Sequence, residues 1–129
     1  MLNGFEKETA QLNDYERNTL LPIVVAGLRS KVGKSKAIAN AKICAKMKAA
    51  GYVLTEPRLR KIINYIRLNG LVECLIATSD GYYIATSEQE LLEYAESLLS
   101  REQAIAAIRQ AISQQRKNKF SAQQQTLNF

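Results

Sequence analysis

The sequence contains no histidine and no tryptophan, and it has only two cysteines and two prolines. The absence of histidine removes the commonest general base and every catalytic triad built on that side chain. Two cysteines without histidine also cannot supply the four ligands of a usual zinc site. We therefore expect a protein that is not an enzyme and that needs no metal or other cofactor.

Long apolar segments are missing as well. The longest run, LLPIVVAGL at 20–28, contains a proline and is much shorter than the ~18 residues that a membrane span needs. The opening MLNGFEKETAQLND lacks the basic start and the apolar centre of a signal peptide. These features predict a cytoplasmic protein with no membrane contact. In that compartment Cys44 and Cys74 are expected to be reduced and buried, with a single disulfide as the alternative.

The net charge of +6 is unevenly distributed along the chain. Residues 29–69 hold eleven Lys or Arg and one acid, Glu56, whereas residues 70–102 hold seven acids and one basic residue, Arg101. A basic block of this size in a protein of mixed charge predicts a polyanionic partner. The alternative is a solvated lysine face that only aids solubility.

The N-terminal part of the chain predicts a helix and then a loop. Asp14 is placed to cap a helix over about 15–28, in which Pro22 marks either the first turn or a kink. The stretch RSKVGKSK at 29–36, called the basic loop below, is expected to be flexible. The residues AIA at 37–39 suit a short strand.

Two further helical patterns follow. In the first, Asn40 is the expected N-terminal cap and Gly51 the end of the helix; in the second, Thr55 is the expected cap and Gly70 the end. Apolar residues recur at helical spacing in each, which predicts one buried face per helix. The residues expected on these faces are Ile43, Cys44, Met47, Leu59, Ile62, Ile63 and Ile66.

The C-terminal part predicts a hairpin and a long helix. LVECLIA and YYIAT flank the turn sequence TSDG, which is a hairpin signal. Ser87 and Glu90 have the spacing of a capping box for the helix. Its apolar residues, interrupted by Arg101, follow heptad positions a and d: Leu91, Tyr94, Leu98, Ile105, Ile108 and Ile112. We expect the first half to pack on the domain and the second to find a partner, so that a homodimer forms through Leu98, Ile105, Ile108 and Ile112.

The stretch LTEPRLRKIINYIRLNGLVECLIATSDGYYIAT resembles the recognition helix and wing of small winged-helix proteins encoded by bacteriophages and prophages. The resemblance implies an α+β, mainly helical fold: a winged helix-turn-helix with a short β-hairpin wing and a long C-terminal helix. It also implies binding to double-stranded DNA. The expected organisation is an N-terminal extension at 1–12, a winged-helix domain at 13–86, a helix at 87–116 and a flexible tail at 117–129.

The exposed side of the third predicted helix is the expected base-reading surface. Arg60, Lys61 and Asn64 lie opposite its apolar face, with Arg58 and Arg67 on the flanks. In the major groove Arg can bind guanine with two hydrogen bonds, and Asn can bind adenine in the same way. The N-terminus of this helix and the lysines before it suit the DNA backbone. The complete expected set is Lys31, Lys34, Lys36, Lys42, Thr55, Arg58, Arg60, Lys61, Asn64 and Arg67.

The chain ends in QQTLNF, which resembles the hexapeptide form of the bacterial sliding-clamp-binding motif. Gln124, Leu127 and Phe129 occupy the places of its glutamine, leucine and aromatic residue, although Gln125 stands where an apolar residue is common. The resemblance implies that the replication sliding clamp is a second partner. The alternative is chance, or apolar residues that fold back on their own domain.

Other functions stay open at this point. The basic face could dock an acidic protein, in which case the chain binds or inhibits a host replication protein without reading DNA. A DNA-binding chain could equally be a transcription regulator, and Asp80 at the wing tip weakens any reading of the minor groove. A nuclease would need clustered carboxylates, but the acids at 88, 90, 93 and 96 are spread around a helix.

Overall fold

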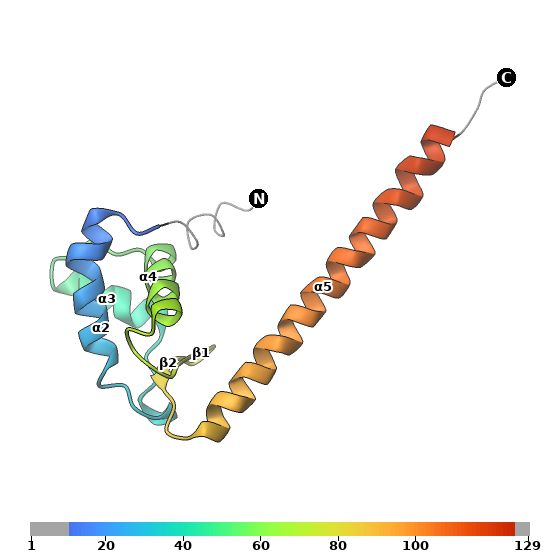
Figure 1. The fold of residues 1–129 in the computed structure, drawn as a ribbon. Coiled ribbons are helices and arrows are strands. Elements are labelled where there is room, and N and C mark those ends of the chain that lie inside the picture. The colour runs from blue at the N-terminus through green and yellow to red at the C-terminus, as the bar shows by residue number, and fades with distance from the viewer. Residues whose placement is uncertain (1–10, 126–129) are drawn as a thin grey trace. The chain divides into compact units, whose positions relative to one another are not determined.

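The computed structural model describes residues 11–125, and the chain divides into two compact units, residues 1–91 and 92–129. The fold is α+β and mainly helical, with one two-stranded antiparallel sheet and a long C-terminal helix (Figure 1). The elements are, in order, the π-helix η1 (Glu16–Leu20), α2 (Leu21–Leu28), the 3₁₀ turn η2 (Lys34–Lys36), α3 (Asn40–Ala49), α4 (Glu56–Asn69), β1 (Leu75–Thr78), β2 (Gly81–Ile84) and α5 (Glu88–Gln125).

The first helix begins at a reciprocal capping box. The side-chain Oδ1 of Asn13 accepts a hydrogen bond from the backbone N–H of Glu16, and Glu16 Oε1 accepts one from the backbone N–H of Asn13, both at 2.8 Å. The expected cap at Asp14 is therefore wrong by one residue. Asn13 and Glu16 have the three-residue spacing that satisfies two exposed helix donors at once, which Asp14 lacks.

A π-helical turn explains how Pro22 fits within one continuous helical segment. Proline has no N–H to donate, and its ring presses on the carbonyl four residues earlier. The wider turn of η1 immediately precedes α2, in which Pro22 lies at the first turn. Pro22 therefore lies in the first turn of α2, inside a continuous helical segment and directly after a wider turn that can accommodate its ring.

The predicted boundaries of α4 are confirmed. Thr55 caps the helix by accepting a hydrogen bond from the N–H of Arg58 at 3.4 Å, and Gly70 ends it in the left-handed conformation with φ of 64°. The expected cap at Asn40 is wrong, because Asn40 is the first residue of α3 and makes no capping bond. Its side chain instead accepts a hydrogen bond from the hydroxyl of Tyr82 at 2.8 Å. The side chain of Asn40 therefore makes a hydrogen bond to the hairpin and none to the N-terminus of its own helix.

The basic loop is fixed along one edge of the hairpin, which corrects the expectation that it is flexible. The N–H of Gly33 donates to the carbonyl of Ile84 at 2.9 Å, and the N–H of Ile84 donates to the carbonyl of Lys31 at 2.7 Å. Ile38 and Tyr82 exchange two further backbone hydrogen bonds, at 3.0 and 2.9 Å. The expected strand at 37–39 is thus a single antiparallel bridge at Ile38.

One apolar core joins the elements of the first unit. The face of α4 predicted from helical spacing is fully buried, and α2, α3 and the inner face of the hairpin pack around it. Tyr82 and Tyr83 are both buried on successive hairpin positions. The two cysteines are free, as expected, but Cys44 is only half-buried and Cys74 is exposed. Cys74 lies in the loop after α4, where it adopts a positive φ of 64°.

The second unit consists of α5 from residue 92 onward. The helix continues to Gln125, so the stretch 117–125 that was expected to be a flexible tail is helical. This extension is consistent with a C-terminal sequence that contains Ala, Lys, Arg and Gln and no Pro or Gly after residue 82. Ser87 and Glu90 cap its start as expected, except that Glu90 reaches the backbone N–H of Thr86 at 2.8 Å. No helix among residues 11–125 is long and apolar enough to cross a membrane.

Gly81 lies against the backbone of Ile38, just after the basic loop, and it gives the first prediction. A Cβ at Gly81 would lie 2.4 Å from the backbone carbon and oxygen of Ile38, and its φ of 125° disfavours any other residue. We expect Gly81→Ala to lower the free energy of unfolding by about 3 kcal/mol or more, measured by urea denaturation.

The matched control is Gly27→Ala. Gly27 lies inside α2, where a Cβ would meet no atom within 4 Å. Because alanine favours helix over glycine, this variant should be neutral or gain up to ~1 kcal/mol. Equal stability of the two variants would show that the backbone of Ile38 leaves room for a side chain at Gly81.

Candidate nucleic-acid interface

A buried carboxylate fixes α4 to the first helix. Glu16 is 2% exposed and accepts hydrogen bonds from Lys61 Nζ at 2.8 Å and from Arg58 Nε at 3.2 Å. The guanidinium carbon of Arg58 lies 5.4 Å from the centre of the Tyr15 ring. A terminal nitrogen of the same guanidinium donates a hydrogen bond to the carbonyl of Val53 at 3.4 Å. One acid at the start of the first helix therefore holds two basic side chains from the first two turns of α4.

The ionisation of Glu16 favours this arrangement. Burial of the carboxylate raises its pKa. The hydrogen bond and charge of Lys61, the backbone hydrogen bond of Asn13 and the charge of Arg58 lower the pKa, and their effect prevails. The carboxylate is consequently charged in the folded protein at neutral pH, and its ion pairs are intact there.

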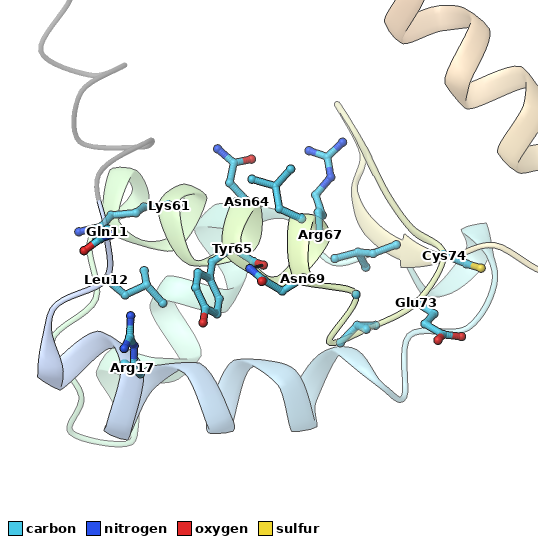
Figure 2. A pocket seen from close by; sticks show the side chains of 14 residues that line it. Gln11, Leu12, Arg17, Lys61, Asn64, Tyr65, Arg67, Asn69, Glu73 and Cys74 are labelled. Carbon is cyan, nitrogen blue, oxygen red and sulfur yellow. Dashed lines mark hydrogen bonds between the residues drawn. The ribbon is translucent and has the colours of Figure 1, made fainter.

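The expected base-reading residues of α4 do not share one environment. Lys61 was expected to face away from the core, but only 13% of its side chain is exposed, because it is bound to Glu16. Arg58 is 28% exposed for the same reason. Arg60 is exposed, and Asn64 and Arg67 are half-buried. In Figure 2 Asn64 and Arg67 project from α4 on the side away from the first helix.

A groove of about 930 Å³ runs beside the C-terminal half of α4. Tyr65 points from α4 towards the first helix, where Leu12 and Arg17 lie (Figure 2). Most of the groove is apolar, and its basic side chains come from two different elements of the first unit. The residues that line it are Gln11, Leu12, Arg17, Lys61, Asn64, Tyr65, Arg67, Leu68, Asn69, Gly70, Val72, Glu73, Cys74 and Leu75.

Three of the lysines before α4 line another depression, which is smaller than the groove. Lys31 and Lys36 of the basic loop and Lys42 in the first turn of α3 line it, together with Ser30 and Ser35. Lys36 and Lys42 are exposed and Lys31 is half-buried. Three lysines and two serines therefore line one open depression, and residues of these types are suited to binding a phosphate.

The remaining predicted residues lie apart from these two hollows. Lys34 is exposed on η2, and Thr55 is exposed at the start of α4, where its hydroxyl oxygen is used for capping. The tip of the hairpin consists of Ser79 and Asp80, between the paired residues Thr78 and Gly81. Both tip residues are exposed, so a carboxylate is the only charged group that the tip presents.

Sequence reasoning missed Glu16 and Arg17. For Glu16 a signal exists, because N-x-x-E at 13–16 is the spacing of a capping box and marks a glutamate at the start of a helix. No local pattern indicates that this glutamate also binds α4, since its partners lie 42 and 45 residues away. No local pattern marks Arg17 as a groove residue either.

The residues predicted for dimerisation and clamp binding belong to the second unit. Leu98, Ile105, Ile108 and Ile112 are all exposed on α5. Gln124 lies in the last turn of the helix, while Leu127 and Phe129 lie outside the described residues. Within residues 11–125, no three His, Cys, Asp or Glu side chains come together as a metal site.

Comparison with known proteins adds no homologue to this description. None of the protein-family models, curated proteins and solved structures with which the chain was compared matches it.

The Glu16 pairs predict an acid-dependent stability. Because the pKa of Glu16 is depressed in the folded state, its contribution is complete above the ordinary glutamate value of 4.5 and is lost as the pH falls through the lower folded-state pKa. We expect Glu16→Gln to cost about 2–4 kcal/mol at pH 7, because it leaves two basic side chains without their counter-charge. The cost should shrink towards pH 3, as measured by urea denaturation across this range.

Glu73→Gln is the control, because Glu73 is an exposed acid on the same unit. It should change stability by less than ~0.5 kcal/mol at either pH. If Glu16→Gln behaved like this control at pH 7, the ion pairs would contribute nothing to the position of α4.

Proposed function

We propose that this chain is a non-enzymatic, cytoplasmic winged-helix protein of the phage type that binds double-stranded DNA. The order helix, bridge, helix, helix and hairpin supports this proposal, as does the pairing of Ile38 with the outer edge of β2. In winged helix-turn-helix proteins that order accompanies a recognition helix, here α4, which enters the major groove.

The observation that carries the proposal is the meeting of Lys31, Lys36 and Lys42 around one depression. These residues come from the basic loop and from the first turn of α3, and the fold directs them to the same depression. Lys42 lies in the first turn of α3, where the partial positive charge of a helix N-terminus also favours an anion. A phosphate of the DNA backbone bound there would fix the register of the protein on the duplex.

Within α4 we divide the predicted residues by task. Arg60 and Asn64 are assigned to base edges, for which Arg–guanine and Asn–adenine pairs have the right geometry. Arg58 and Lys61 are assigned to positioning, because both are bound to Glu16. Thr55 and Lys34 remain proposed backbone contacts at the start of α4 and on η2.

The groove beside α4 supports a second candidate function, that of a protein-interaction module. Its apolar lining and the guanidinium groups of Arg17 and Arg67 suit an amphipathic acidic segment of a replication protein. Purification of the chain from its native host, with bound molecules identified, separates the two functions. Recovery of an acidic protein without DNA would favour this second candidate.

The DNA proposal predicts a steep dependence on salt. If about six phosphates are contacted, the logarithm of the affinity should fall with the logarithm of salt concentration with a slope of about −5.

On a preferred sequence selected from random duplexes, Arg60→Ala or Asn64→Ala should lower the binding free energy by about 1–3 kcal/mol. Lys36→Ala should weaken all sequences alike, because backbone contacts carry no sequence information. Fluorescence anisotropy of labelled duplexes measures both effects.

Lys117→Ala is the control, since it removes the same charge from α5 and should leave the affinity within about twofold. A flat salt response, or an absence of duplex binding at low salt, would remove DNA from the proposal. Equal losses on selected and random DNA for Arg60→Ala and Asn64→Ala would remove base reading only.

We further propose that the C-terminal residues tether the protein to the bacterial sliding clamp, which would make it a replication accessory. Leu127 and Phe129 would enter an apolar pocket while the amide of Gln124 makes directed hydrogen bonds. Since α5 continues to Gln125, binding in an extended form requires its last turn to open. Helix ends fray readily, so this opening is a small step.

The tether predicts that a peptide of residues 118–129 binds purified clamp with a Kd of about 1 μM, or some −8 kcal/mol. In the full chain, Leu127→Ala with Phe129→Ala should abolish clamp binding and leave DNA binding unchanged. Gln125→Ala, outside the three motif positions, should retain both activities. Clamp binding that survives the double substitution, or that is absent from the wild type, would contradict the tether.

A further inference from the structure

The charges of α5 are separated along its length. From Glu88 to Glu102 the helix carries five acids and one basic residue, Arg101. From residue 103 to Gln125 it carries four basic residues and no acid. One half of the helix is therefore acidic and the other half is basic.

The helix dipole does not account for this separation. Acids near a helix N-terminus and bases near its C-terminus are favourable, but the effect fades within the first and last turns. Glu88 and Glu90 lie in the first turn of α5, whereas Glu96 and Glu102 lie well beyond it. Arg109 is likewise far from the last turn. Most of the charges are placed where the dipole of their own helix has little influence.

An apolar stripe runs through the point where the two halves meet. Ile105, Ile108 and Ile112 are 66%, 64% and 58% exposed, and Leu98 lies seven residues before Ile105 on the same side. Spacings of seven, three and four residues are those of heptad positions a and d, which form the seam between two paired helices. The stripe is thus an exposed surface of the second unit that suits another helix.

We propose that this stripe pairs with α5 of a second copy of the chain in antiparallel orientation. In a parallel pair the acidic halves would lie side by side, and so would the basic halves, which is unfavourable along the whole seam. In an antiparallel pair each acidic half lies against a basic half. The charge separation thus favours a second α5 helix as the partner and the antiparallel orientation of the pair.

One antiparallel register fits the side chains. If Leu98 of one copy faces Ile108 of the other, then Tyr94 faces Ile112 in the next layer outward. Arg101, which interrupts the stripe, comes level with Ile105 of the second copy. At such a position the aliphatic part of an arginine side chain can pack against the apolar seam. Its guanidinium group can then reach a neighbouring acid, here Glu102 of the second copy. The interruption then becomes a charge contact between the two chains.

Distances between spin labels test the direction directly. On a Cys44→Ser, Cys74→Ser background, one label is attached at Gln103→Cys and, in a second variant, at Lys117→Cys; both positions are exposed. The antiparallel pair places the two labels at 103 level with each other and separates those at 117 by roughly 42 Å along the axis. A parallel pair gives the same separation for both variants, and that result would overturn the orientation.

The pairing itself is tested by light scattering at tens of micromolar, where the wild type should have the mass of a dimer. Ile105→Asp with Ile108→Asp places charges in the seam and should give monomers with unchanged helix content by circular dichroism. A monomeric wild type would overturn the proposal. Because the pairing uses only α5, its outcome is independent of whether the first unit binds DNA.

Discussion

The position of α4 depends on one buried carboxylate. Glu16 closes the capping box that begins the first helix and, with its remaining hydrogen-bonding capacity, binds Lys61 and Arg58 of α4. The same group therefore orders a helix end and joins two elements of the core. Any surface that α4 presents is set by this contact on one side and by the burial of its apolar face on the other. The charged partners are satisfied inside the protein, which is what makes a carboxylate acceptable there.

Where local chemistry decides the structure, the sequence was sufficient. The threonine cap, the apolar spacing and the terminal glycine of α4 each act within a few residues, and all three are confirmed. Two of the misplaced features have long-range causes. The side chain of Asn40 binds the hydroxyl of Tyr82 and does not cap its helix. The basic loop is held by backbone hydrogen bonds to β2. Neither partner can be identified from the neighbouring sequence, because each lies more than forty residues away.

The same distinction applies to the candidate interface. A helical wheel separates a buried face from an exposed one, but it assigns flanking residues only by angle. The wheel places Lys61 on the exposed face, but Glu16, which is distant in the sequence, binds it, so its charge is used inside the protein. A count of basic residues therefore overstates the charge offered to a partner. The grouping of Lys31, Lys36 and Lys42 is the opposite case, because these lysines are close in the sequence and line one depression in the fold.

The two kinds of contact made by Glu16 also differ in when they can form. Its hydrogen bonds with Asn13 span three residues, whereas its bond with Lys61 closes a loop of 45. Closing a long loop costs chain entropy before any contact compensates for it, so such contacts tend to form late in folding. The start of the first helix can therefore exist before α4 is attached to it. Weakening the ion pairs should then act mainly on the unfolding rate, which makes this carboxylate a determinant of how long the folded state persists.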